Sequence, residues 1–129
     1  MTDKKEIGDK GEDFAASYFH KQGYEIKARN VHSRYGEIDL IAENEVTVVF
    51  VEVKTRSHDS LDRAADAVTP LKQKKIILTA LDYISKSNTD KIMRFDVFEV
   101  YHANGRIYKF YHIKNAFEGS DFGDGLGYY

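Results

Sequence analysis

Residues 46–54 read VTVVFVEVK, a run that is β-branched almost throughout and ends in two charged positions. Such a run favours a central strand that is covered on both faces. The segment before it, residues 36–43, is also largely apolar, and a tight turn at Asn44 joins the two. The sequence therefore predicts two neighbouring strands, over residues 36–43 and 46–55, with the other elements arranged around them.

Weaker signals place the remaining elements on either side. Apolar residues at helical spacing predict a helix over residues 5–22, which Gly23 ends, and alternation over 24–30 predicts a half-buried strand. Residues 56–68 are polar and predict a mobile loop with a short helical turn. Thr69 and Pro70 form an N-cap and a first helical position, so a second helix should run to about residue 86. Two more strands are expected near 93–102 and 106–113, across the hairpin signal Asn104-Gly105.

This order, one helix, three strands, one helix and two strands, predicts an α/β sandwich with a mixed β-sheet flanked by helices. The chain has 129 residues, which suits one domain with a single core. We expect that domain to cover residues 1–117. Residues 118–129 are rich in glycine and tyrosine and are expected to form a flexible C-terminal tail.

Composition excludes several classes of protein. The chain has no cysteine, so disulfide frameworks, zinc–thiolate sites and thiol nucleophiles are ruled out. A net charge of −2 argues against a protein that coats nucleic acid by bulk electrostatics. No apolar signal region or bilayer-length segment is present, so we expect no membrane association and a cytoplasmic location.

Charged residues interrupt the two central strands where apolar residues would be expected. Strand alternation places Glu52 and Lys54 side by side on one face, with the carbonyl of Val53 between them. Asp39 interrupts the preceding apolar strand, and a short hairpin could bring it next to Glu52. Two carboxylates about 4 Å apart repel by roughly 4 kcal/mol at an effective dielectric of ~20. Something positive must therefore lie between them.

A hard divalent cation, Mg²⁺ or Mn²⁺, meets this requirement because it prefers oxygen ligands and accepts one or two carboxylates. Asp39, Glu52 and the Val53 carbonyl are the candidate ligands. Such an ion would polarise a phosphodiester and lower the pKa of a bound water. Lys54 would then orient or help to deprotonate that water and balance charge in the transition state.

Glu12 is a fourth candidate, because helical spacing turns it toward the buried face of the first helix. Gly8 and Gly11 would allow that helix to approach the sheet closely. The alternatives are structural: Glu52 and Lys54 could be a solvated pair at a strand end, and Glu12 could be an acid favoured by the helix dipole. The coincidence of all four residues favours a site.

Basic residues near this site could contact nucleic-acid phosphates, although an ordinary solvated helix face explains the three lysines equally well. The candidates are Lys72, Lys74, Lys75, Arg34 and Arg56. Arg94 and Asp96 are expected to form a structural salt bridge. Five histidines show no metal-ligand spacing and are assigned surface roles, with only His58 in a loop near the site: His20, His32, His58, His102 and His112.

Several motifs together resemble the YraN-type family of bacterial proteins, a branch of the PD-(D/E)XK restriction-endonuclease-like superfamily. They are GDKGE at residues 8–12, Asn30, GEIDLI at 36–41, VVFVEVKTR at 48–56, KQKK at 72–75 and RFDV at 94–97. The arrangement is more distantly similar to archaeal Holliday junction resolvases. It departs from the superfamily pattern in one place, where Ile38 replaces the proline before Asp39.

The resemblance implies a restriction-endonuclease-like αβββαβ core and a homodimer. It also implies that Glu12, Asp39 and Glu52 are metal ligands or lie beside them, and that Lys54 is the catalytic lysine. Two functions stay open. One is a metal-dependent nuclease acting on nucleic acid, DNA rather than RNA, with selectivity for branched structures. The other is a catalytically silent nucleic-acid-binding or protein-interaction module on the same scaffold.

Overall fold

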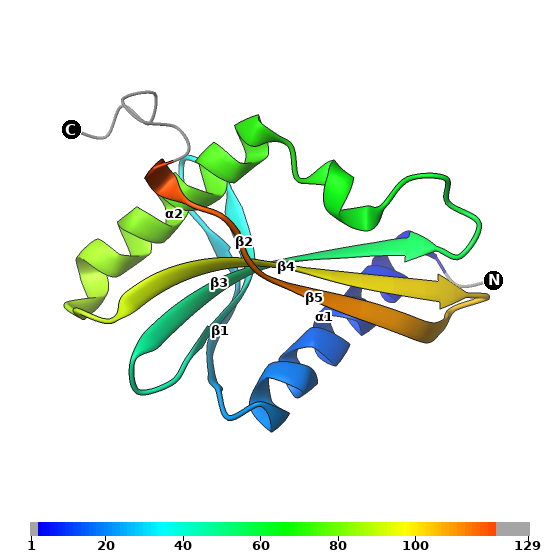
Figure 1. Ribbon diagram of the computed structural model, residues 1–129, viewed down its shortest axis with the longest axis horizontal. Coiled ribbons are helices and arrows are strands. Elements are labelled where there is room, and N and C mark those ends of the chain that lie inside the picture. The colour runs from blue at the N-terminus through cyan, green and yellow to red at the C-terminus, as the bar shows by residue number, and fades with distance from the viewer. Residues whose placement is uncertain (1–2, 121–129) are drawn as a thin grey trace.

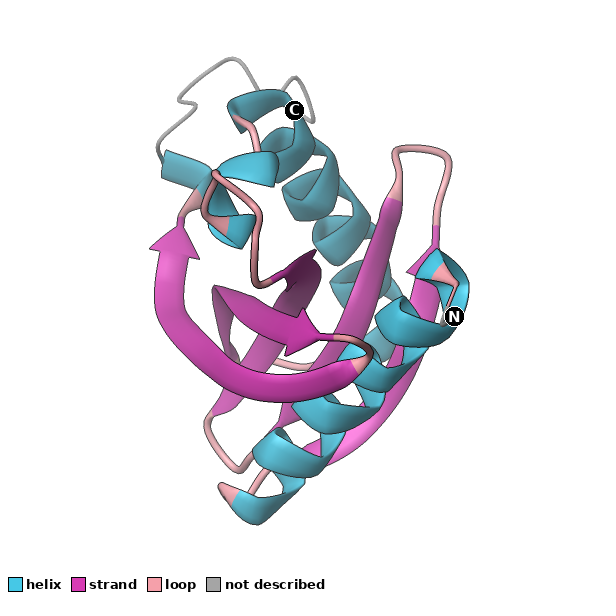
Figure 2. Cartoon of the chain, turned by 90° about the vertical axis from the view of Figure 1, so that its right-hand side faces the viewer, coloured by secondary structure: helices cyan, strands magenta, loops and turns pink. Residues whose placement is uncertain are grey.

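The computed structural model describes residues 3–120, which form a five-stranded mixed sheet with a helix on each face (Figures 1 and 2). The predicted α/β class is confirmed and is consistent with a restriction-endonuclease-like core. The strands follow one another across the sheet in chain order. In chain order the elements are α1 (Lys4–Lys21), β1 (Glu25–His32), β2 (Glu37–Glu43), β3 (Thr47–Ser57), η1 (Ala64–Ala67), α2 (Pro70–Ser87), β4 (Ile92–Ala103) and β5 (Arg106–Phe117).

Both helices begin at side-chain caps. The Asp3 carboxylate accepts the Glu6 N–H at 2.8 Å, and the Thr69 hydroxyl accepts the Lys72 N–H at 3.3 Å. Pro70 begins α2, as its sequence predicts. The predicted helical turn in the 56–68 segment is η1. Most of the predicted tail, residues 121–129, lies outside the described residues.

Alternation along β3 divides the core into two layers. Val48 and Phe50 pack under α2, whereas Val49 and Val51 pack under α1. All four side chains are buried, as expected for a strand covered on both faces. The 46–54 run therefore holds both layers of the protein together.

The ladder between β2 and β3 stops before β3 ends, which leaves the last part of β3 unpaired on its β2 side. The β2–β3 ladder ends at the pair Leu40–Val51, whereas the parallel β3–β4 ladder continues to Ser57 and His102. Beyond Val51, β3 has a ladder partner only on its β4 side. The residues at this open edge include Glu52 and Lys54.

Helix α1 approaches β3 closely beside that edge. A Cβ atom added at Gly11 would lie 2.3 Å from the Thr55 hydroxyl oxygen, so only glycine fits without a shift. The prediction for Gly11 is therefore confirmed. It is wrong for Gly8, where an added Cβ would meet nothing within 4 Å.

Candidate active site at the open edge of β3

Asp39 takes over the main-chain pairing where the ladder ends. Its Oδ2 accepts the N–H of Val53 at 2.8 Å, in the position that a carbonyl of β2 would otherwise fill. In an extended residue the N–H and carbonyl project toward the same neighbouring strand, so the Val53 carbonyl also points to the Asp39 side. The structure thus brings together Asp39 and Val53, two of the candidate ligands.

Glu52 is a buried acid, with its side chain only 3% exposed. Burial raises its pKa from the ordinary 4.5 to about 8, the hydrogen bond and charge of Asp39 add to the rise, and Lys72 and Lys54 oppose it. Lys72 Nζ lies 3.1 Å from Glu52 Oε2, and its charge favours the ionised form of that acid. The alternative of a solvated pair at a strand end is therefore wrong.

Lys54 and Lys72 differ in how tightly they hold a proton. Burial lowers the pKa of Lys54, and the neighbouring Lys72 lowers it further, against the raising effect of Glu52. Burial also acts to lower the pKa of Lys72, but its contacts with Lys54 and Glu52 outweigh that and raise it. Lys54 therefore loses its proton more readily, which leaves a neutral amine able to accept one, and Lys72 is the more persistent cation.

Glu12 lies on the α1 side of the same edge. Burial raises its pKa, the charge of Asp39 raises it further, and Arg29 opposes the shift from 4.0 Å away. Glu12 also lines a cleft of about 670 Å³ between α1 and the end of β3, together with Lys54 and Arg56. Asp39 thus influences both Glu12 and Glu52, and all four predicted residues gather at one edge.

The donor set suits a hard divalent cation held by few protein ligands. No three acidic or histidine side chains within residues 3–120 form a metal-binding group by themselves. Magnesium commonly takes only one or two carboxylates and completes its shell with water and substrate oxygen. Two adjacent carboxyls, Asp39 and Glu52, with the Val53 carbonyl directed to the same side, fit that pattern. The charge of Asp39 helps to raise the pKa of Glu52, and a cation between the two carboxyls would relieve that repulsion.

The basic candidates separate into different environments. Lys72 belongs to the site itself, through Glu52. Lys75 lines a neighbouring hollow with Gly36, and Arg56 lines the cleft beside Lys54. Arg34 instead donates to the Tyr35 hydroxyl at 2.7 Å. Phosphate contacts for these residues and for Lys74 remain a prediction.

Two buried acids on β4 have structural partners. Asp96 forms the predicted salt bridge, accepting from Arg94 at 2.8 and 2.9 Å. Its Oδ2 also lies 2.6 Å from Nε2 of His112, so the predicted surface role of that histidine is wrong. Glu99 accepts the Arg63 guanidinium and the Ala65 N–H.

Comparison with known proteins places the chain in a family. A family model described as "Uncharacterised protein family UPF0102" matches residues 11–100. The chain belongs to the uncharacterised protein family UPF0102. This confirms the family that its motifs indicate.

UPF0102 relatives match nearly the whole chain. A UPF0102 protein of Clostridioides difficile (strain 630) is 44% identical over 114 residues, covering 88% of this chain and 97% of its own. One from Caldanaerobacter subterraneus subsp. tengcongensis is 43% identical over 119 residues, covering 90% and 98%. One from Geotalea uraniireducens is 38% identical over 118 residues, covering 91% and 93%.

No helix within residues 3–120 has both the length and the apolar character that crossing a bilayer requires.

Proposed function

We propose that this UPF0102 chain is a Mg²⁺- or Mn²⁺-dependent nuclease of the PD-(D/E)XK type. One observation carries the proposal: the buried Glu52 carboxyl lies beside Asp39 and two lysines at an open strand edge. Burying an acid costs free energy unless it is paired, and a module that only binds has no use for two adjacent carboxyls. Strongly shifted pKa values of this kind are concentrated at functional sites.

Each residue has a part in phosphodiester hydrolysis. Asp39, Glu52 and the Val53 carbonyl are the groups that would hold the cation, with Glu12 supporting them from α1. When bound, such a cation polarises the phosphodiester and lowers the pKa of water. Lys54, whose pKa is lowered, orients the attacking water and accepts its proton. Lys72 keeps its charge and stabilises the negative charge that develops on the phosphate oxygens. Hydrolysis leaves a 5′-phosphate product.

The proposal extends to substrate and assembly. We propose DNA rather than RNA as the substrate, with preference for branched structures, and a homodimer that presents two such sites. A two-fold dimer would place two equivalent clefts against a junction that has its own symmetry. Sedimentation of the chain alone and with a four-way junction tests the assembly.

The activity test is a cleavage panel with labelled junction, flap, single-stranded, duplex and RNA substrates in Mg²⁺ or Mn²⁺. We expect Glu52→Ala and Lys54→Ala each to lower cleavage by about 100-fold or more. Matched controls are Glu45→Ala, an exposed acid of the β2–β3 turn, and Lys86→Ala, a lysine of α2 paired with Asp82. Both controls should cleave as wild type does.

Cleavage that survives both site changes would come from a contaminant and would overturn the proposal. Binding without cleavage on every substrate would instead support the silent module.

A further inference from the structure

Strand β5 has a basic and aromatic sequence that the nuclease site does not use. Residues 106–114 read RIYKFYHIK, and the whole strand carries Arg106, Lys109 and Lys114 but no acid. The chain as a whole has a net charge of −2, so this positive charge is local. β5 pairs only with β4 and is therefore an edge of the sheet.

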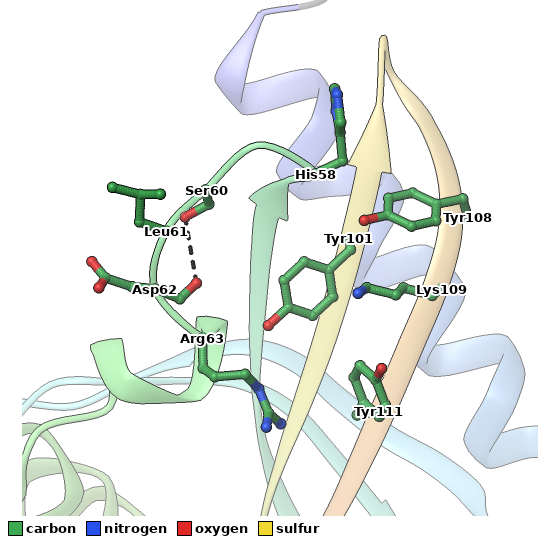
Figure 3. A pocket seen from close by; sticks show the side chains of 9 residues that line it. All are labelled: His58, Ser60, Leu61, Asp62, Arg63, Tyr101, Tyr108, Lys109 and Tyr111. Atoms are coloured by element: carbon green, nitrogen blue, oxygen red, sulfur yellow. Dashed lines mark hydrogen bonds between the residues drawn. The ribbon is translucent and has the colours of Figure 1, made fainter.

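Exposed tyrosine rings and cations meet in a hollow of about 300 Å³ at the end of β4 and the start of β5 (Figure 3). The Lys109 ammonium lies 5.5 Å from the ring centre of Tyr108 and 5.8 Å from that of Tyr111. The guanidinium carbon of Arg63 lies 5.2 Å from the Tyr111 ring centre. Tyr108 is 50% exposed and Tyr111 47%, although rings of this size are usually well covered. The hollow thus presents aromatic surface to solvent beside two cations.

Register places this hollow on the same sheet face as the candidate active site. Paired residues in neighbouring strands share a face, and Lys54 pairs with Glu99, which pairs with Tyr111. Strands lie about 4.8 Å apart, so Tyr111 is about 10 Å across the sheet from Lys54. Glu99 accepts from Arg63 Nε at 3.1 Å, which fixes the guanidinium beside the ring.

We infer that Tyr108 and Tyr111, with Lys109 and Arg63, form a stacking platform for unpaired nucleotides of the nucleic acid. Proteins that hold single strands combine aromatic rings, on which bases stack, with cations that follow the backbone. Duplex bases are already stacked and cannot use such rings. As a substrate-holding device the platform rests on the proposed function, and it specifies substrates that have single-stranded nucleotides near the scissile bond.

The basic residues of β5 have an alternative explanation, namely protection of the sheet edge. Lysines on an edge strand also prevent pairing with other chains, but that role requires no exposed tyrosines. One acid, Asp62, shares the hollow, and its carboxylate points away from the rings (Figure 3). The exposed rings therefore distinguish a stacking platform from a protected sheet edge, and the test changes those rings.

The test measures binding to the full chain in EDTA, by anisotropy of a labelled oligothymidylate of about 15 nucleotides. Tyr108→Leu and Tyr111→Leu should each weaken binding by roughly 5- to 100-fold, because each removes a stacking surface. Tyr108→Phe and Tyr111→Phe keep the rings and should bind nearly as wild type does. An oligouridylate arm reports whether the platform distinguishes RNA from DNA.

An abasic strand of the same length is the decisive control. It has no bases to stack, so the leucine variants should bind it as well as wild type does, and the same should hold for a duplex. Wild-type affinity of the leucine variants for oligothymidylate, or an equal loss on the abasic strand, would overturn the inference. So would a change in oligomeric state in those variants, which would make the patch a contact between copies of the chain.

Cleavage plays no part in this measurement, so its failure is distinguishable from failure of the nuclease proposal. Ring-dependent binding by a chain that cleaves nothing would leave the platform in place without the nuclease. Binding that does not depend on the rings, together with intact Glu52-dependent cleavage, would support the nuclease and overturn the platform.

Discussion

Replacing Glu52 with glutamine should change how the stability of the protein depends on pH. Glutamine resembles the protonated acid and cannot ionise. In wild type the pKa of Glu52 is raised from 4.5 to about 8, so the folded state binds its proton more tightly than the unfolded state does. The stabilisation from that proton is complete below about pH 4.5 and is lost as pH rises toward 8.

One proton difference changes the free energy of unfolding by about 1.4 kcal/mol per pH unit. Between pH 5 and 7, wild type should therefore lose roughly 2.5 kcal/mol relative to Glu52→Gln. The Glu52 side chain is 3% exposed, so solvent screens this effect little. The groups facing it are Asp39, Lys72 and Lys54, and the measured proton belongs to this cluster as a unit.

Urea unfolding at pH 5, 6 and 7 in EDTA measures the difference, with Glu45→Gln as an exposed control that should follow wild type. A wild-type minus Glu52→Gln difference that stays constant within about 0.5 kcal/mol across this range would refute the reasoning. It would mean that Glu52 is ionised across this pH range, so that burial and the neighbouring Asp39 do not raise its pKa.

Two further predictions concern metal binding and helix packing. At pH 7 Glu52 is mostly protonated, so Mg²⁺ or Mn²⁺ should release close to one proton on binding, seen as a calorimetric enthalpy that depends on the ionisation heat of the buffer; equal enthalpies in two dissimilar buffers would contradict this. Gly11→Ala should destabilise the protein by about 1–2 kcal/mol through its clash with Thr55, net of the higher helix propensity of alanine. In a Thr55→Ala background the same change should be neutral or stabilising by up to about 1 kcal/mol, and a denaturant double-mutant cycle that shows additivity would exclude the clash.

Local signals predicted most of the fold because each element carries its own. The 46–54 run identified the central strand, and Thr69 with Pro70 marked the start of α2. The end of β5 was missed by four residues, since the strand runs to Phe117 rather than 113. The reason is tertiary: Asn115 adopts a positive φ of 51° and donates its N–H to Asp96 at 3.0 Å, across a register shift. No local pattern reveals that contact.

Strand geometry alone was enough to predict which residues of β2 and β3 lie together at the candidate site. Alternation and a short hairpin were enough to bring Asp39, Glu52 and Lys54 together. The contact between Lys72 and Glu52 depends on how α2 crosses the sheet, and spacing along α2 cannot show it. The tyrosine hollow had a visible signal, the alternating aromatic and basic residues of 106–114, but its position relative to the site required the register of β3, β4 and β5.

The hydrogen bond from Val53 to Asp39 gives this proposed metal ligand a structural role as well. Its oxygen accepts the first main-chain N–H beyond the end of the ladder, which would otherwise be free to pair with a foreign strand, as exposed edges do. If the proposed function holds, substitutions at this position are constrained by folding as well as by chemistry. Asp39→Asn, whose amide oxygen can still receive that N–H, separates the two roles more cleanly than Asp39→Ala does.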